Sequence, residues 1–277
     1  MNLLGALALV AALVAFSLTF RTARNRSWKV RAGWLLAMGL LSLPACLMAL
    51  YYLHGLPEWA WFYTFRSWPG SEFCVVPLGA ASALFATWLP RVLLVLPLGG
   101  FLGASLVPYL KPVLWPIQED FADHWEEGVC RQSTFSTCGP ASLATILRSH
   151  GVQVAEREIA RSAHSYQGGT EAWYLARYAR AHGMKPRFVF RESFDPQVRF
   201  PAIVGVKIGA SGHFIAVLGC TDGTVTFADP LCGRETLSLG EFHKRYRFTG
   251  FHLVVTHSDP AVKPGDPDSP AAPVDPG

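Results

Sequence analysis

The sequence predicts a helical membrane domain, a mixed α+β soluble domain and a short polar tail. Charged residues make up only 16% of the 277 residues, whereas soluble domains carry about 25%. The deficit lies before Lys111, because the first 110 residues contain seven lysines or arginines and two acidic residues. A single soluble globule is therefore excluded. The chain divides into residues 1–111, 112–257 and 258–277, and the last part, rich in proline and aspartate, is expected to be disordered.

The membrane domain contains apolar segments sufficient for about four transmembrane helices. Met1–Phe20 and Ala32–Leu53 can each cross a hydrocarbon core of about 30 Å as a helix. Cys74–Leu110 would run to roughly 55 Å as one helix. Because Pro90-Arg91 divides this segment, we expect a helical hairpin. Arg21–Arg31 carries five positive charges, and the positive-inside rule predicts that this loop is cytoplasmic.

The number of crossings decides on which side of the membrane the soluble domain lies. Four crossings place the N-terminus and the soluble domain outside, so we expect an extracytoplasmic domain on a bacterial inner membrane. If one half of the hairpin does not cross, the soluble domain lies in the cytoplasm instead. The aromatic residues of His54–Phe73 are expected at the headgroup interface.

Hydrophobic periodicity and turn residues define the elements of the soluble domain. Apolar residues at helical spacing precede Gly151 and Gly183, and glycine commonly follows the last turn of a helix. Asp222-Gly223 between two apolar runs predicts a β-hairpin, and Ser238 with Glu241 forms the capping-box pattern of a helix start. The expected helices are Cys138–His150, Glu156–His164, Thr170–His182 and Leu237–Tyr246, and the expected strands are Lys185–Phe190, Ala202–Val206, His213–Gly219, Thr224–Ala228 and Phe251–Thr256.

Cys138 is placed where a loop becomes a helix, in the segment QSTFSTCGPASL. Pro140 lies in the first turn, a position that helix starts favour. The positive end of the helix dipole favours a thiolate there, and the thiolate is the nucleophilic form of cysteine. For Cys138 taken alone, burial as a small apolar residue is the simpler explanation.

Three other residues could complete a site for nucleophilic catalysis. His213 opens an apolar strand, and Asp229 ends the next strand of the same hairpin. A carboxylate there can accept a hydrogen bond from one imidazole nitrogen and leave the other nitrogen facing the thiol. The side-chain amide of Gln132, six residues before the cysteine, could donate to an oxyanion. Each feature is common by itself, but their order and spacing together predict a catalytic site.

The combination resembles the C39 peptidases, a family of papain-like cysteine peptidase domains, over about residues 120–255. The matching segments are QSTFSTCGPASLATIL, GHFIAVLG and ADPLCGRETLSLGEF. The resemblance implies that Cys138 is the nucleophile and that His213 is its general base and acid. It also implies that Asp229 is the orienting carboxylate and Gln132 the oxyanion donor. The predicted fold class is therefore an N-terminal helical membrane domain plus a C-terminal α+β papain-like cysteine peptidase domain.

The arrangement of this chain departs from that of the best-known members of the family. Those members cleave bacteriocin leader peptides after a double glycine and carry the peptidase domain at the N-terminus of an ABC exporter. Here the domain follows the membrane segments, and no Gly-x4-Gly-Lys-Ser/Thr phosphate loop occurs in the sequence. The expected partners are a peptide or protein substrate, the membrane and, as an open alternative, a separate transporter.

The sequence thus predicts a membrane-anchored cysteine endopeptidase that hydrolyses peptide bonds and needs no cofactor. Two alternatives stay open: a non-catalytic module that captures a peptide for a transporter, and an acyl transferase of the same fold. Nucleic-acid binding is disfavoured because no basic stripe is interleaved with aromatic residues. The cysteine and histidine spacings fit no common metal site. If the domain is extracytoplasmic, two of Cys130, Cys220 and Cys232 could form a disulfide.

Overall fold

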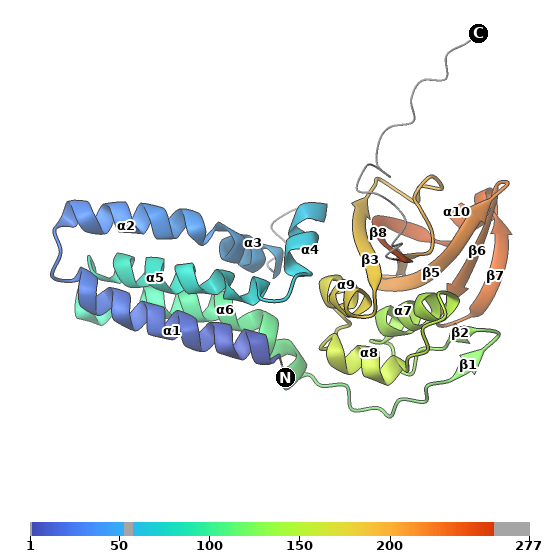
Figure 1. The fold of residues 1–277 in the computed structure, drawn as a ribbon, viewed down its shortest axis with the longest axis horizontal. Helices are drawn as coiled ribbons and strands as arrows, with labels where there is room; N and C mark the ends of the chain where they lie inside the picture. Colours follow the sequence, from blue (N-terminus) through green and yellow to red (C-terminus); the bar gives the residue numbers. More distant parts are fainter. Residues whose placement is uncertain (1, 53–57, 258–277) are drawn as a thin grey trace, which may run out of the picture.

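The computed structural model describes residues 2–52 and 58–257, which form a helical region and an α+β domain (Figure 1). The tail predicted to be disordered, 258–277, lies outside the described residues, as does the end of the predicted segment Ala32–Leu53. Within the described residues, the helical region consists of α1 (Leu3–Ala23), α2 (Trp28–Leu41), α3 (Leu43–Tyr52), α4 (Ala60–Arg66), the 3-10 turn η1 (Ser71–Cys74), α5 (Val75–Ala86), the 3-10 turn η2 (Arg91–Leu93) and α6 (Val95–Leu114).

The second predicted membrane segment is two helices rather than one. Helix α2 ends at Leu41 and α3 begins at Leu43, and their axes differ by 54°. Pro44 follows directly, and proline lacks the N–H that a continuous helix needs and disfavours helical geometry in the residue before it. The bend is therefore the local effect of one proline.

The described part of the aromatic stretch 54–73, which is expected at a headgroup interface, includes α4, and α4 contacts the α+β domain. Phe62 and Tyr63 are buried, and the Tyr63 ring lies 5.2 Å from that of Phe190 and 5.3 Å from that of Phe188. The sequence did not indicate that a folded neighbour covers these two side chains. Trp59, Trp61 and Trp68 remain exposed.

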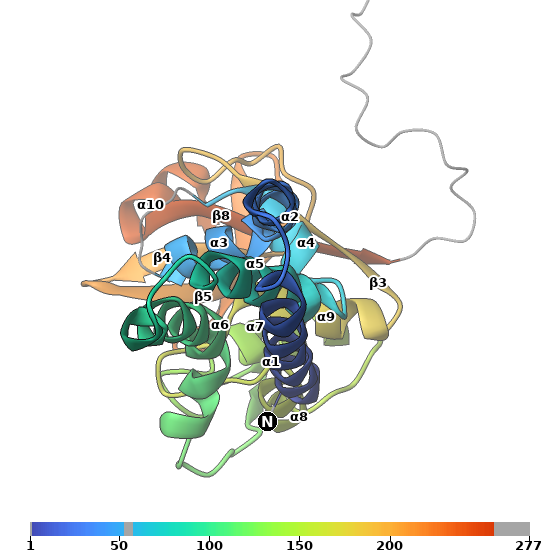
Figure 2. The ribbon, with the colours of Figure 1, turned by 90° about the vertical axis from the view of Figure 1, so that its left-hand side faces the viewer.

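The two ends of the helical region differ in charge and in what they contact. At one end, the Asn2 side chain donates to the hydroxyl of Tyr174 in the α+β domain over 2.9 Å. At the other end, the Arg31 guanidinium donates to the carbonyl of Thr87 over 3.1 Å. Figure 2 looks along these helices, with α1, α2, α5 and α6 in front of the α+β domain. The basic loop Arg21–Arg31 therefore lies at the end remote from the α+β domain (Figure 1).

One helix of the described residues, α1, is long and apolar enough to cross a membrane by itself, with a mean hydropathy of 2.4. Two bent pairs pass the same criterion when each is counted as one span, which gives up to three. The first pair is α2 with α3. The second joins α4 to Ser71–Ala86 through a bend of 112°.

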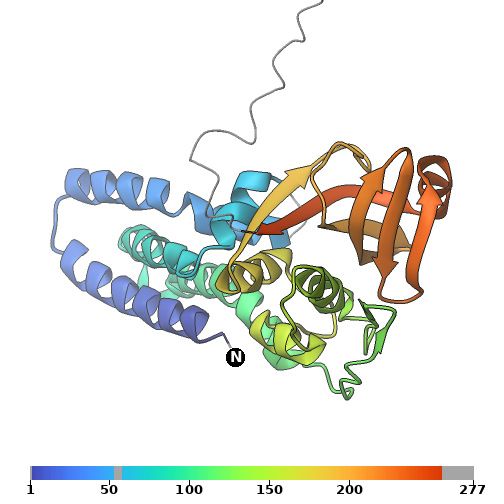
Figure 3. The same ribbon diagram turned by 45° about the vertical axis from the view of Figure 1, so that its right-hand side comes forward.

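The α+β domain is built on a six-stranded antiparallel sheet with strand order β3-β8-β4-β5-β6-β7. Helices α7 to α9 pack on one face and α10 on the other, and Figure 3 shows the curvature of the sheet between them. The bounds are β1 (Trp125–Glu126), β2 (Val129–Cys130), α7 (Cys138–Ser149), α8 (Glu156–Ser162), α9 (Ala172–Ala181), β3 (Met184–Phe190), β4 (Ala202–Ile208), β5 (Ser211–Thr221), β6 (Thr224–Asp229), β7 (Gly233–Ser238), α10 (Leu239–Arg245) and β8 (Arg247–His257).

The predicted helices and strands of this domain are confirmed, with ends shifted by a few residues. The hairpin turn has positive φ at both central residues, 51° at Asp222 and 72° at Gly223, as a tight two-residue turn requires. The capping box of Ser238 and Glu241 is present at the start of α10. Strand β7 was not predicted, because Gly233–Ser238 is mostly polar and forms the edge of the sheet.

A junction of aromatic rings and ion pairs holds the helical region against α9 and β3. The buried Trp173 ring lies 5.2 Å from that of Tyr51 and 5.4 Å from that of Tyr63. The Arg177 guanidinium forms a 2.8 Å ion pair with the fully buried carboxylate of Glu72. It also donates to the carbonyls of Arg66 and Trp68, each over 3.0 Å. The junction therefore combines buried aromatic rings with directional polar contacts.

Candidate active site

The nucleophile candidate is the first residue of α7, as the sequence predicts. Cys138 is buried, with 8% of its surface exposed. The Ser142 hydroxyl donates to the Phe214 carbonyl on β5 over 3.1 Å, which fixes α7 against that strand. Gly139 permits this close approach, because a Cβ there would lie 2.9 Å from Leu175 and 3.3 Å from the Phe214 ring.

His213 lies between a carboxylate and the thiol. Its Nε2 is 2.8 Å from Oδ1 of Asp229, and both side chains are buried. The other ring nitrogen, Nδ1, is the one left for a hydrogen bond with the thiol of Cys138. The two residues lie on neighbouring strands β5 and β6, whose register pairs Ala216 with Ala228.

The environment of the imidazole favours its charged form. Burial acts to lower the pKa of His213, but the hydrogen bond with Asp229 and that with Cys138 outweigh it and raise the pKa to about 9. Burial acts to raise the pKa of Asp229, but the hydrogen bond from His213 and further donors hold this pKa below its ordinary value. The pair is therefore an imidazolium and a carboxylate at neutral pH.

Tyr246 is a site residue that the sequence did not indicate. Its hydroxyl donates to Oδ2 of Asp229 over 2.7 Å, and the Leu231 N–H donates to Oδ1 over 2.9 Å. With His213, three donors thus fix both carboxylate oxygens. Tyr246 directly follows α10, and no local sequence pattern indicates that its side chain reaches Asp229 at the end of β6.

Gln132 lies in the loop before α7, close to the end of β6. Its backbone N–H donates to the carbonyl of Pro230, the residue after Asp229, over 3.1 Å. Its side-chain amide donates to the Thr134 carbonyl over 2.8 Å, which uses one of the two N–H groups of that amide. The structure therefore brings all four predicted residues to one place.

The nucleophile loop is also held from the helical region. The Ser136 hydroxyl donates to the Gln167 carbonyl over 2.7 Å. The Gln167 N–H in turn donates to the carbonyl of Trp115, just after α6, over 2.9 Å. The Lys111 ammonium donates to the Tyr166 hydroxyl over 3.1 Å. A short path of contacts therefore runs from the end of α6 to the loop that carries the cysteine.

The other thiols take no part in this arrangement. All six cysteines are unpaired, so the disulfide considered among Cys130, Cys220 and Cys232 is not formed in this structure. Burial, reinforced by the charges of Glu156 and Asp123, raises the pKa of Cys130 to about 12 and makes it a poor nucleophile. No group of three or more histidine, cysteine or acidic side chains in residues 2–52 and 58–257 is placed to hold a metal ion.

Two solved structures are each similar to 47% of the chain. The peptidase domain of Streptococcus ComA, described as a bi-functional ABC transporter involved in quorum sensing, is 21% identical with a TM-score of 0.42 and covers 47% of this chain and 97% of its own. A double glycine motif protease from an AMS/PCAT transporter, in complex with the leader peptide, is 24% identical with a TM-score of 0.41, and the match covers 47% of this chain and 91% of that chain.

Relatives found by sequence comparison also match about half of the chain. An uncharacterized protein of Methanothermobacter marburgensis is 37% identical over 134 residues, which cover 48% of this chain and 92% of that protein. The probable functional amyloid protease FapD of Pseudomonas aeruginosa is 28% identical over 149 residues, 49% of this chain and 66% of that protein. The sequence model of the Peptidase C39 family matches residues 126–260. With the archaeal relative matched over nearly its whole length, the chain belongs to the Peptidase C39 family.

Proposed function

We propose that this protein is a membrane-anchored cysteine peptidase that hydrolyses peptide bonds through Cys138, His213, Asp229 and Gln132. The observation that carries the proposal is the position of His213, which bonds Asp229 through Nε2 and faces the thiol at the start of α7 with its other nitrogen. A base between an orienting acid and a thiol is the arrangement that activates a cysteine nucleophile.

In the first half of the reaction, Cys138 attacks the scissile carbonyl carbon as the thiolate, and its proton is the one that His213 already carries as the imidazolium. The first N–H groups of a helix have no acceptor within it. The Cys138 N–H and the free N–H of the Gln132 side chain therefore donate to the oxyanion. The imidazolium then protonates the leaving amine, the C–N bond breaks, and a thioester on Cys138 remains.

In the second half, water replaces the amine. Neutral His213 takes a proton from this water as it attacks the thioester carbonyl, and the tetrahedral intermediate collapses to release the acid and the thiol. Asp229 stabilises the imidazolium in both halves and keeps the ring in one orientation. Its bonds from Tyr246 and Leu231 keep the carboxylate itself from turning.

The helical region serves as the membrane anchor in this proposal. Helix α1 has 21 residues, about 30 Å at 1.5 Å per residue, which matches a hydrocarbon core. The five positive charges of Arg21–Arg31 lie at the end remote from the peptidase domain. By the positive-inside rule that end is cytoplasmic, which puts the active site on the extracytoplasmic side, close to the membrane surface.

The test follows the reactivity of thiols in the full-length protein in neutral detergent, treated with an epoxide-type thiol inhibitor and analysed by intact mass and peptide mapping. Exposed Cys232 serves as the internal reference. We expect buried Cys138 to react at least about tenfold faster than Cys232, because its thiolate is stabilised by the imidazolium. The His213→Ala variant should lose this advantage, whereas His124→Ala, an exposed control, should keep it.

Peptide products decide between the remaining alternatives. A new carboxyl terminus on a digested peptide pool supports hydrolysis, whereas a new amide linkage would mean acyl transfer. Equal labelling of Cys138 and Cys232, or labelling that does not depend on His213, would contradict an activated site. Fast labelling without any product would favour the peptide-capture module.

A further inference from the structure

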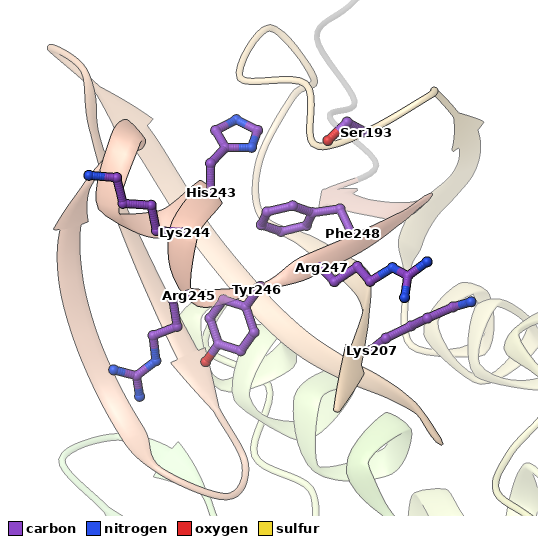
Figure 4. A pocket seen from close by; sticks show the side chains of 8 residues that line it. All are labelled: Ser193, Lys207, His243, Lys244, Arg245, Tyr246, Arg247 and Phe248. Atoms are coloured by element: carbon purple, nitrogen blue, oxygen red, sulfur yellow. The ribbon is translucent and has the colours of Figure 1, made fainter. Parts of the chain in front are cut away.

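A basic groove of about 540 Å³ lies where β4 ends and β8 begins. Tyr246 and Phe248 form its floor, and four cationic side chains surround them (Figure 4). Lys207 and Arg247 extend alongside each other from the two strands, while Lys244 and Arg245 extend from the other side of the groove.

Two of these four positive charges are uncompensated. Arg245 forms a two-pronged ion pair with Glu235, over 2.7 and 3.0 Å. Lys244 lies near Glu241, and its charge contributes to lowering the pKa of that carboxyl. Lys207 and Arg247 are exposed and form no ion pair within the described parts of the chain. Lys207 and Arg247 are direct register partners on neighbouring strands, and like charges in that position destabilise a sheet. A bound anion would remove this cost.

The register of the sheet brings Lys207 next to the active site. Gly205 pairs with Phe214, Val206 with His213, and Lys207 with Gly212. Phe214 packs against the start of α7 at Gly139, beside the nucleophile. Because every second residue of a strand shares a face, Lys207 lies on the same face as Gly205 and Phe214, the face that packs against α7. The backbone of Lys207 is thus paired with Gly212, the residue before His213, and Arg247 is its partner on the other side.

We propose that Lys207 and Arg247 form a subsite for an acidic side chain of the peptide substrate. A glutamate or aspartate between the two cations would accept hydrogen bonds from both, and a guanidinium matches a carboxylate with two parallel N–H groups. The inference rests on the proposed peptide substrate and adds to it a preference for acidic sequences near the scissile bond.

Peptide binding to the inactive full-length Cys138→Ala variant tests the subsite. The probes are fluorescent octapeptide pools of random sequence, made in pairs. Within a pair, one position is always glutamate in the first pool and always glutamine in the second, and this position differs from pair to pair. At low salt we expect the best glutamate pool to bind about tenfold more tightly than its glutamine match, and the difference to shrink in 0.5 M salt. Adding Lys207→Gln and Arg247→Gln should abolish the difference.

A matched control variant loses the same two positive charges but leaves the groove intact. Lys185→Gln with Arg199→Gln removes two exposed cations elsewhere in the domain, and the glutamate preference should persist. Equal binding of the paired pools, or an equal loss in the control, would overturn the subsite. If the wild-type enzyme cleaves the pools without acidic preference, the subsite fails while hydrolysis stands. If it cleaves none but the binding preference persists, hydrolysis fails and acidic capture stands.

Discussion

The catalytic cluster and the junction with the helical region are both buried contacts between distant parts of the chain, but they are built differently. In the catalytic cluster, directional hydrogen bonds join Asp229 to His213, Tyr246 and the Leu231 N–H within 2.9 Å. In the junction, the Trp173 ring packs at an angle against several tyrosine and phenylalanine rings. Ion pairs of Arg177 with Glu72 and of Lys111 with Glu171 also cross the contact.

This difference separates the two tasks. Proton transfer demands one orientation of one ring, and only hydrogen bonds of fixed direction supply it. Holding two bodies together needs buried area, which aromatic rings provide with little loss of conformational freedom. Damage to the cluster should therefore affect chemistry first, and damage to the junction should affect stability first.

The largest effect is expected for Asp229→Asn. With the carboxylate gone, the imidazolium loses its charged partner, and we expect kcat to fall by about 10³-fold. In the wild type the imidazolium is lost as the pH rises through about 9, so activity should decline above that value. In the variant the pKa of His213 drops, and the decline should move to lower pH. Rates of peptide hydrolysis measured from pH 5 to 10 for the wild type and the variant check the fall in kcat and the shift of the decline. A decline at the same pH in both proteins would contradict the role of Asp229 as the partner of the imidazolium.

Tyr246→Phe should have an intermediate effect. The variant leaves Oδ2 of the buried Asp229 without its donor, which costs about 1.5–3 kcal/mol in the free energy of unfolding. We expect roughly a tenfold loss of kcat as the carboxylate gains freedom to turn. Tyr178→Phe is the matched control, since that hydroxyl donates to Glu158 away from the site. Equal kcat values for the two variants would show that Tyr246 does not position Asp229.

The smallest effect on chemistry is expected for Arg177→Met. The variant removes the ion-pair partner of the buried Glu72 carboxylate, and breaking such a pair costs about 3–5 kcal/mol in the free energy of unfolding. The rate of Cys138 labelling in the protein that stays folded should change by less than about twofold, because no catalytic residue contacts Arg177. The double variant with Glu72→Gln should regain part of the stability. A large fall in labelling would mean that the junction also shapes the site.

Local sequence patterns were sufficient for most elements of the peptidase domain. Asp222-Gly223 specified the hairpin that brings His213 and Asp229 to neighbouring strands, and Gly151 specified the end of the nucleophile helix. The patterns failed where a tertiary neighbour determines the outcome. Phe62 and Tyr63 resemble membrane-interface residues by composition, yet they are buried against the α+β domain.

The sequence by itself predicted the hairpin and the nucleophile helix, because each depends on spacing within a few residues. The distribution of charge predicted the division of the chain, and the resemblance to a known family pointed to the four residues expected in the site. Only the tertiary structure decided that Tyr246 completes the site, that Lys207 faces Arg247, and that α6 is linked to the nucleophile loop. These contacts join segments whose meeting depends on strand order and helix packing. Local propensity carries no information about such long-range pairings.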